Sequence, residues 1–308
     1  MKQIVITEFM DEPAVARLRA VHQVVYEPAL VDDPVRLHAL AADADALIVR
    51  NRTQVRGELL AALQRCRVVG RLGVGLDNID VSACQARGMQ VIPATGANAL
   101  SVAEYVIASA MLLLRGAYWS SAAVAAGTWP RNALSKWREL GGKTLGVIGF
   151  GHIGQLTAGL ARGLGMQVLA FDAVLAAHDA VYAAAGVAAV SLEDLVARAD
   201  VITLHVPLVD STRGLFGATR LAAMRPDAVL INTARGGIVD ELALAQALRS
   251  GHLGGAAIDV FGTEPLPAQP HFEGCPNLLL TPHVAGVTSE SNERVSSLGA
   301  AKVLEALR

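Results

Sequence analysis

Short apolar runs of strand length alternate with runs rich in alanine and leucine along most of the chain. Strands that alternate with helices form parallel sheets covered by helices on both faces. The sequence therefore predicts an α/β fold with doubly wound parallel sheets. The predicted strands are Gln3–Thr7, Ala46–Val49, Val68–Arg71, Thr144–Ile148, Gln167–Phe171, Val201–His205, Ala228–Asn232, Gly255–Asp259 and Leu278–Leu280. The predicted helices are Pro13–Ala20, Pro34–Ala41, Gly57–Leu63, Asn98–Leu114, Ile153–Leu164, Ser191–Ala199, Glu241–Ser250 and Glu290–Leu307.

The alternation falls into two blocks, and a chain of 308 residues has room for two domains. The first block covers roughly the opening third. The second begins near the long helix at Asn98 and contains the strands from Thr144 onward. The segment from Gly116 to Gly142 predicts a long connection between domains. The last helix follows Gly286 and could return to the first block, although the periodicity does not show this return.

Charge and cysteine usage exclude several classes of protein. The net charge is −2 and no block of Lys and Arg stands out, so a nucleic-acid partner has no electrostatic basis. Cys66, Cys84 and Cys275 lie far apart without a CxxC motif, which predicts no metal site and a reducing, cytoplasmic compartment. The opening residues do not resemble a signal peptide. The apolar stretch Ala97–Leu114 contains polar residues, which favours a buried helix over a membrane span.

A glycine-rich turn fits the pattern G-x-G-x-x-G at Gly149, Gly151 and Gly154, between a predicted strand and a predicted helix. The first glycine permits a tight turn, the second allows a pyrophosphate to approach the backbone, and the third allows close helix–strand packing. The helix start, at His152 and Ile153, offers free N–H groups to phosphates. This context predicts dinucleotide binding, although a purely structural turn could have the same sequence pattern.

Asp172 ends the next strand and lies 18 residues after Gly154. An acidic residue at this place accepts hydrogen bonds from the adenosine ribose hydroxyls. Its charge would repel a 2′-phosphate, so the sequence favours NAD over NADP. The alternative is an ordinary surface aspartate.

Three further segments follow strands of the second block, where open parallel sheets place their ligands. They carry Arg235, Glu264 and His283. Oxidation of a hydroxy acid requires a cation for the carboxylate, a base for the hydroxyl proton and a carboxylate that orients the base. These residues supply one of each. From spacing alone, each could equally be a solvated or structural side chain.

At these residues the sequence resembles the D-isomer-specific 2-hydroxyacid dehydrogenase family, particularly its phosphoglycerate dehydrogenase branch. The similarity runs over nearly the whole chain, with several motifs in the right order. The matching segments are Arg71–Asp80, Asn98–Glu104, Gly149–Gly154, His205–Leu208, Thr233–Gly237, Asp259–Pro265 and Pro282–His283.

The resemblance implies two Rossmann-like domains with an active site in the cleft between them. The substrate domain would comprise residues 1–97 and 287–308, and the NAD-binding domain residues 98–286. Arg235 would bind the substrate carboxylate, His283 would be the acid/base, and Glu264 would pair with His283. Family members are usually homodimers joined largely through the long helix, here residues 98–115, and they close by hinge motion.

The resemblance also implies further contacts. Backbone N–H groups of Val74 and Gly75 would bind the substrate carboxylate. Asp259 would contact the nicotinamide carboxamide, close to His283. The remaining residues expected along NAD are Val206, Pro207, Thr212, Thr233 and Ala234.

Two departures narrow the comparison. Longer phosphoglycerate dehydrogenases carry C-terminal regulatory domains that bind serine, and this chain ends at Arg308, so we expect no serine feedback. Glu264 indicates that the chain is not a formate dehydrogenase, because that relative has Gln at the equivalent site.

The sequence is less informative about the substrate. Arg50, Arg52 and Arg71 lie at or near strand ends of the first block, and the segment around Arg50 resembles the family's substrate loop. One of them could bind a second anion, or all could be surface residues. We expect a 3-phosphoglycerate-like acid, with 3-sulfolactate and glycerate- or glyoxylate-type acids as alternatives. A non-catalytic, NAD-sensing corepressor and a different Rossmann enzyme are the competing interpretations.

Overall fold

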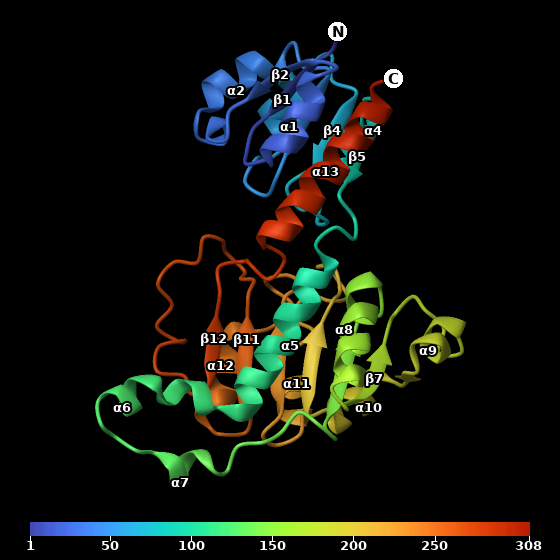
Figure 1. The fold of residues 1–308 in the computed structure, drawn as a ribbon. Coiled ribbons are helices and arrows are strands. Elements are labelled where there is room, and N and C mark those ends of the chain that lie inside the picture. The colour runs from blue at the N-terminus through green and yellow to red at the C-terminus, as the bar shows by residue number, and fades with distance from the viewer. The chain divides into compact units, whose positions relative to one another are not determined.

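The predicted α/β architecture with doubly wound parallel sheets is confirmed in the computed structural model, which describes residues 1–308 (Figure 1). The chain forms two units. Unit 1 comprises Met1–Asn98 together with Val287–Arg308, and unit 2 comprises Ala99–Gly286. Each unit is built around its own parallel sheet.

Unit 1 contains a five-stranded sheet in the order β2-β1-β3-β4-β5. Every strand pairs in parallel with its neighbours. The strands are β1 Gln3–Ile6, β2 Gln23–Tyr26, β3 Ala46–Val49, β4 Val68–Arg71 and β5 Gln90–Pro93. The helices are α1 Glu12–Arg19, α2 Pro34–Ala41, α3 Gly57–Ala62, α4 Val81–Ala86 and α13 Ser289–Ala306.

Helix α13 belongs to unit 1, where it packs beside α1 and against β4 and β5. Two glycines allow this close approach. A Cβ atom at Gly70 would lie 2.8 Å from Val303, and one at Gly299 would lie 2.8 Å from Leu72. A capping box at Thr288 fixes the start of α13. The small residues therefore determine where the last helix can dock.

Unit 2 contains a seven-stranded sheet in the order β12-β11-β10-β9-β6-β7-β8. The strand order reverses between β6 and β9, the place where this kind of sheet binds dinucleotides. The strands are β6 Thr144–Ile148, β7 Gln167–Phe171, β8 Ala188–Ala189, β9 Val201–Leu204, β10 Val229–Asn232, β11 Gly255–Ile258 and β12 Leu278–Leu280. The helices are α5 Ala99–Arg115, α6 Ser121–Ala125, α7 Arg131–Leu134, α8 His152–Gly163, α9 Ala180–Ala185, α10 Leu192–Arg198, α11 Ala218–Ala223 and α12 Glu241–Arg249.

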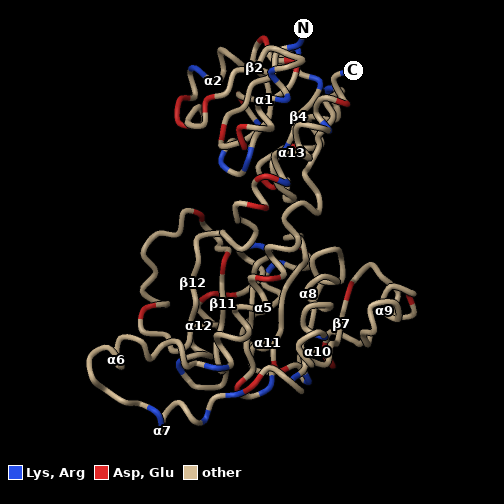
Figure 2. Tube along the Cα trace, viewed as in Figure 1, with Lys and Arg blue, Asp and Glu red and all other residues tan.

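Helices α5 and α8 pack side by side in unit 2. Their apolar faces share one core with Val147, Phe150 and Val168. No single helix combines the length and apolar character that crossing a membrane requires; only Ala99–Arg115 with the bent continuation Ala117–Ala125 passes that test as a pair. Acidic and basic residues are interspersed along the chain in both units (Figure 2).

Two sequence predictions need correction. The segment from Gly116 to Gly142 does not connect the units, because it joins α5 to β6 within unit 2 and contains α6 and α7. Strands β2, β5 and β8 were not predicted. All three are edge strands, and β5 also ends in Pro93. Apart from Ile92, the residues of these three strands are exposed or only partly buried, so the core imposes no long apolar run on them.

Candidate active site

The turn between β6 and α8 fits a dinucleotide glycine by glycine. Gly149 has φ +93°, and a Cβ atom there would lie 2.4 Å from the carbonyl oxygen of His205. A Cβ atom at Gly154 would lie 2.2 Å from the oxygen of Gly149, so the helix can pack closely only with glycine there. At Gly151 a Cβ would meet nothing within 4 Å. The first and third glycines are thus required by the fold, while the second keeps the backbone open to a phosphate.

The acidic residue predicted for the ribose lies beside this turn. Oδ2 of Asp172 accepts a hydrogen bond of 2.8 Å from Phe150 N, and Oδ1 accepts from Val174 N at 2.8 Å and Leu175 N at 3.2 Å. These bonds fix the carboxylate at the end of β7. The N–H groups of the first turn of α8 have no partners within the helix and present positive partial charge next to it.

The other residues predicted along the cofactor lie in turns after β9 and β10. The Thr212 hydroxyl donates to Pro207 O at 2.6 Å and accepts from Val209 N at 2.9 Å, which closes a compact turn that begins at Val206. The Thr233 hydroxyl is buried without a hydrogen-bond partner. Beside it, Asn232 Oδ1 accepts from Ala234 N at 3.0 Å. An unpaired buried hydroxyl is costly, and a bound nicotinamide group would satisfy it.

His283 and Glu264 meet directly. Nδ1 of His283 lies 2.7 Å from Oε2 of Glu264, whose Oε1 accepts from Phe261 N at 2.9 Å. Burial raises the pKa of Glu264, but the hydrogen bonds from His283 and Phe261 and the positive charges of His283 and Arg235 outweigh it, so the pKa falls below its ordinary value. The carboxylate is therefore ionised and accepts a hydrogen bond from Nδ1–H, which leaves Nε2 of His283 without a hydrogen bond within the chain.

Arg235 lies in the turn after β10, which packs on the turn that carries Glu264. A Cβ atom at Gly236 would lie 1.8 Å from Phe261 O, so only glycine allows this contact. Arg235 Nη1 donates to Ala234 O at 2.5 Å. The structure thus brings His283 and Glu264 into direct contact and places Arg235 within electrostatic reach of Glu264.

A buried carboxylate holds the His283 turn. Asp259 is 1% exposed and accepts from Thr281 Oγ1 at 2.6 Å, Val284 N at 2.8 Å and Ala285 N at 2.8 Å. His283 has φ +56°, a conformation that non-glycine residues rarely adopt. Thr281 was not predicted to take part in this arrangement. The expected contact of Asp259 with the carboxamide remains a prediction.

Another strand-end histidine is unsuited to acid/base work. Burial lowers the pKa of His205 to about 4, so this ring stays neutral at physiological pH. Its Nε2 lies 3.1 Å from Thr203 Oγ1. His283 is therefore the better candidate.

In unit 1 the predicted substrate residues lie on loops after β3 and β4. Glu8, 5% exposed, accepts from Arg50 N at 2.9 Å, Arg52 N at 3.1 Å and Thr53 N at 3.0 Å. The N–H groups of Val74 and Gly75 make no hydrogen bond within the chain, as their proposed role requires. Glu8 was not predicted, since a lone acidic residue after a strand carries no sequence signal.

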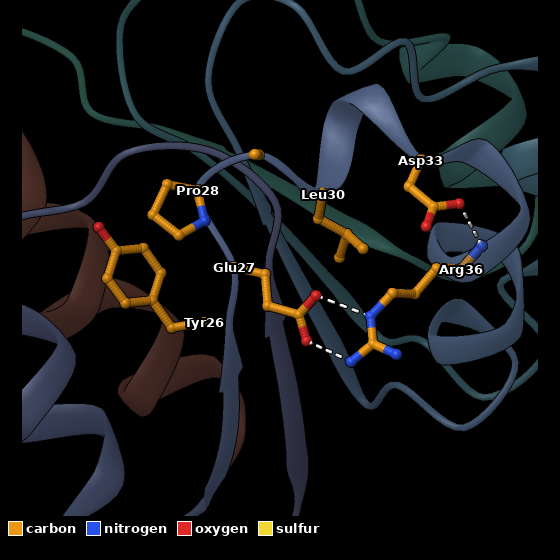
Figure 3. A pocket seen from close by; sticks show the side chains of 7 residues that line it. Tyr26, Glu27, Pro28, Leu30, Asp33 and Arg36 are labelled. Carbon is orange, nitrogen blue, oxygen red and sulfur yellow. Dashed lines mark hydrogen bonds and ion pairs between the residues drawn. The ribbon is translucent and has the colours of Figure 1, made fainter.

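An open hollow of about 440 Å³ in unit 1 lies among Tyr26, Pro28, Leu30 and a pair of charged residues (Figure 3). Arg36 and Glu27 form a two-pronged ion pair there, with Nε to Oε2 at 2.7 Å and Nη2 to Oε1 at 2.6 Å. Their charges satisfy each other, and none of the predicted site residues lines the hollow. No group of three His, Cys, Asp or Glu side chains could hold a metal ion.

Comparison with known proteins identifies a family to which the chain is similar. Residues 107–285 match the NAD binding domain of the D-isomer specific 2-hydroxyacid dehydrogenases. The chain is 52% identical to an (S)-sulfolactate dehydrogenase of Chromohalobacter salexigens, over 100% of this chain and 99% of that protein. It is 43% identical to a D-3-phosphoglycerate dehydrogenase of Mycobacterium leprae, over 87% of this chain but only 50% of that protein. A D-lactate dehydrogenase of Aquifex aeolicus, solved with NAD and lactic acid, superposes with a TM-score of 0.86 at 28% identity, covering 99% of this chain and 95% of that chain.

Proposed function

Because the chain belongs to the D-isomer specific 2-hydroxyacid dehydrogenase family and uses NAD, we propose that its substrate is a 2-hydroxy acid with a second strong anion, preferentially (S)-sulfolactate. The observation that carries this choice is the 52% identity over the full length of both chains. The sequence alone favoured a 3-phosphoglycerate-like acid, with 3-sulfolactate and glycerate- or glyoxylate-type acids as alternatives. We place the sulfonate first because the phosphoglycerate dehydrogenase of M. leprae is matched over only half its length.

The stereochemical labels are compatible. In sulfolactate the sulfur-bearing carbon outranks the carboxyl carbon, whereas in 3-phosphoglycerate the carboxyl carbon has priority. The (S) label of sulfolactate therefore describes the same spatial arrangement as the D-form of 3-phosphoglycerate, and one orientation at C2 serves both acids.

We assign the chemistry to unit 2. Arg235 binds the substrate carboxylate through its planar fork of N–H donors. Nε2 of His283 takes the proton from the C2 hydroxyl, and the ionised Glu264 stabilises the imidazolium that forms. NAD⁺, when bound, supplies the acceptor for the C2 hydride. In the reverse direction His283 returns the proton to the carbonyl oxygen of the 2-keto acid.

We further propose that Val74 and Gly75 bind the substrate carboxylate through backbone N–H groups and that Arg50 binds the second anion. On the cofactor side, Asp172 contacts the adenosine ribose and disfavours NADP. Contacts to NAD come from the glycine turn and from the segments that contain Val206, Thr233 and Asp259.

We also propose a cytoplasmic homodimer joined through the α5 region. The segment after α5 carries Tyr118, Trp119 and Trp129 at 63%, 48% and 76% exposure, and exposed aromatic side chains of this kind gain from burial at an interface. All three cysteines are free thiols, which suits a reducing compartment.

An NADH-absorbance screen tests the substrate. It compares sulfopyruvate, phosphohydroxypyruvate, hydroxypyruvate, glyoxylate and pyruvate as acceptors. We expect the highest kcat/KM with sulfopyruvate and at least about tenfold less with pyruvate, because the loss of one charged contact costs about that much. A higher kcat/KM with phosphohydroxypyruvate would select the phosphate ester, and equal values for all acids would reject a second-anion substrate. NADH binding without turnover on any acid would favour the corepressor interpretation.

A further inference from the structure

The main chain of Arg50 is held from both sides. Its N–H donates to the buried Glu8 at 2.9 Å, and its carbonyl accepts from Asn78 Nδ2 at 3.1 Å. Asn78 also donates to Thr53 O at 2.7 Å, so the loop is tied to a single amide side chain. The start of the Arg50 side chain is therefore fixed before any substrate arrives.

The guanidinium end is held by two uncharged groups. Nη2 of Arg50 donates to Oδ1 of Asn292 on α13 at 2.7 Å, and Cζ lies 5.7 Å from the centre of the Phe9 ring. A guanidinium has five N–H donors, and this is the one hydrogen bond that this group makes here. Four donors remain, enough for a two-pronged grip on a tetrahedral anion.

Two other arginines of unit 1 are held differently, by carboxylates. Arg52, two residues along the chain, donates from both Nη atoms to the Asp32 carboxylate. Arg36 is paired in the same way with Glu27 (Figure 3). A carboxylate partner cancels the positive charge locally, whereas the Asn292 amide leaves it in place. Burial also lowers the pKa of Arg50, against the opposing charge of Glu8, so its guanidinium is partly stripped of water.

From these contacts we propose that Asn292 and Phe9 are positioning residues that present the Arg50 guanidinium, which makes no direct ion pair, to the second anion of the substrate, a sulfonate or phosphate group. Asn292 restrains one edge of the guanidinium without consuming its charge. Phe9 supports the face of the ion through a cation–π contact. This inference rests on the proposed function, because it needs a substrate with an anion at the end opposite the carboxylate.

The substitution Asn292→Asp gives the sharpest test. Aspartate keeps the hydrogen-bond acceptor and the shape of the side chain but adds a charge that neutralises Arg50. We expect KM for sulfopyruvate and for phosphohydroxypyruvate to rise about tenfold or more, with kcat changed less than about twofold and KM for pyruvate unchanged. Asn292→Ala, which removes only the restraint, should raise the same two KM values about threefold.

The control variant is Ser297→Asp, which adds a negative charge to an exposed position of the same helix. It should leave all three KM values unchanged, since exposed charges at a distance are screened. If Asn292→Asp fails to fold by circular dichroism, Phe9→Leu replaces it, with an expected KM rise of about threefold for the two-anion acids only.

The outcomes separate the two proposals. A wild-type preference for two-anion acids that survives Asn292→Asp, or a KM rise shared equally by pyruvate, overturns the positioning role and leaves the proposed function standing. No wild-type preference among the acids overturns both.

Discussion

Glu8 in unit 1 and Asp259 in unit 2 occupy corresponding places in two different sheets. Each is a buried carboxylate just after a strand, and each accepts three hydrogen bonds from the loop that follows the neighbouring parallel strand. Asp259 holds a turn in which His283 has φ +56°, a conformation that costs about 1–2 kcal/mol. Glu8 holds the loop that contains Arg50, and Arg50 does not have a positive φ. The carboxylate thus stabilises an unfavourable backbone in one unit and steadies a long side chain in the other.

Removal of the imidazole at His283 should have the largest effect on activity. We expect His283→Ala to lower kcat by about 10²–10⁴-fold, because general acid/base catalysis is worth that much. Stopped-flow or steady-state NADH absorbance measures the loss. The control is His178→Ala, at an exposed loop position, which should retain full kcat. A fall of less than about threefold in His283→Ala would remove that residue from the mechanism.

Lysine substitutions at the two proposed anion-binding arginines separate their roles. Lysine keeps the charge but loses the two-pronged geometry. Arg235→Lys should raise KM by about 10–100-fold for every 2-keto acid. Arg50→Lys should raise KM by a smaller factor, and only for acids with a second anion. Arg220→Lys, in α11, is the control. Equal effects of Arg235→Lys and Arg50→Lys on pyruvate would contradict the division of roles.

Amide substitutions at Glu8 and Asp259 test whether the two loops have distinct tasks. Asp259→Asn and Glu8→Gln each place an NH₂ group where N–H donors point, and should each lower the free energy of unfolding by about 1–3 kcal/mol. Urea unfolding measures this loss. Asp259→Asn should mainly reduce kcat, and Glu8→Gln should mainly raise KM for sulfopyruvate. If both variants changed the same kinetic constant, the two loops would not have distinct tasks.

Asp172 offers a third instance of the arrangement, since it follows β7 and accepts Phe150 N from the turn after the neighbouring β6. Asp172→Asn keeps the size of the side chain and removes the charge that opposes a 2′-phosphate. We expect the ratio of kcat/KM for NAD to that for NADP to fall about tenfold. An unchanged ratio would mean that Asp172 serves only to fix the turn.

The smallest expected effect concerns pH. The folded-state pKa of Glu264 lies below its ordinary value, so its stabilising contribution is complete above the unfolded-state pKa and disappears as pH falls through the lower value. The difference in unfolding free energy between the wild-type enzyme and Glu264→Gln should therefore be larger at pH 7 than at pH 3. Denaturant titrations at the two pH values provide the measurement. If the difference in unfolding free energy between the two proteins were larger at pH 3 than at pH 7, the expected pH dependence would be wrong.

Much of the fold could be predicted because buried parallel strands leave long apolar runs. β3, β4, β6 and β7, which lie inside their sheets, begin and end as predicted. The edge strand β12 was also predicted, since all three of its residues are leucine, whereas the edge strands β2, β5 and β8 left no such signal. The glycine turn could be predicted from the sequence because the fold requires glycine at fixed positions. At Gly149 and Gly154 a Cβ atom would collide with backbone atoms.

The site was only partly predictable. Residues with known chemical roles stood in recognisable motifs, and the contact of His283 with Glu264 followed from them. Asn292 and Phe9 reach Arg50 from positions 242 and 41 residues away in the sequence, and no local pattern marks such contacts. The same holds for Tyr105 on α5. Its hydroxyl lies 2.5 Å from Oγ1 of Thr281, which donates to Asp259.

The assignment of α13 to unit 1 also has a consequence for biosynthesis. Unit 2 is one continuous stretch, whereas unit 1 needs residues 287–308 to cover β4. On the ribosome, residues 1–98 are translated before unit 2, but α13, which completes unit 1, is translated after it. Unit 2 can therefore fold first, and unit 1 is exposed to chaperones and proteases until residues 287–308 have been translated.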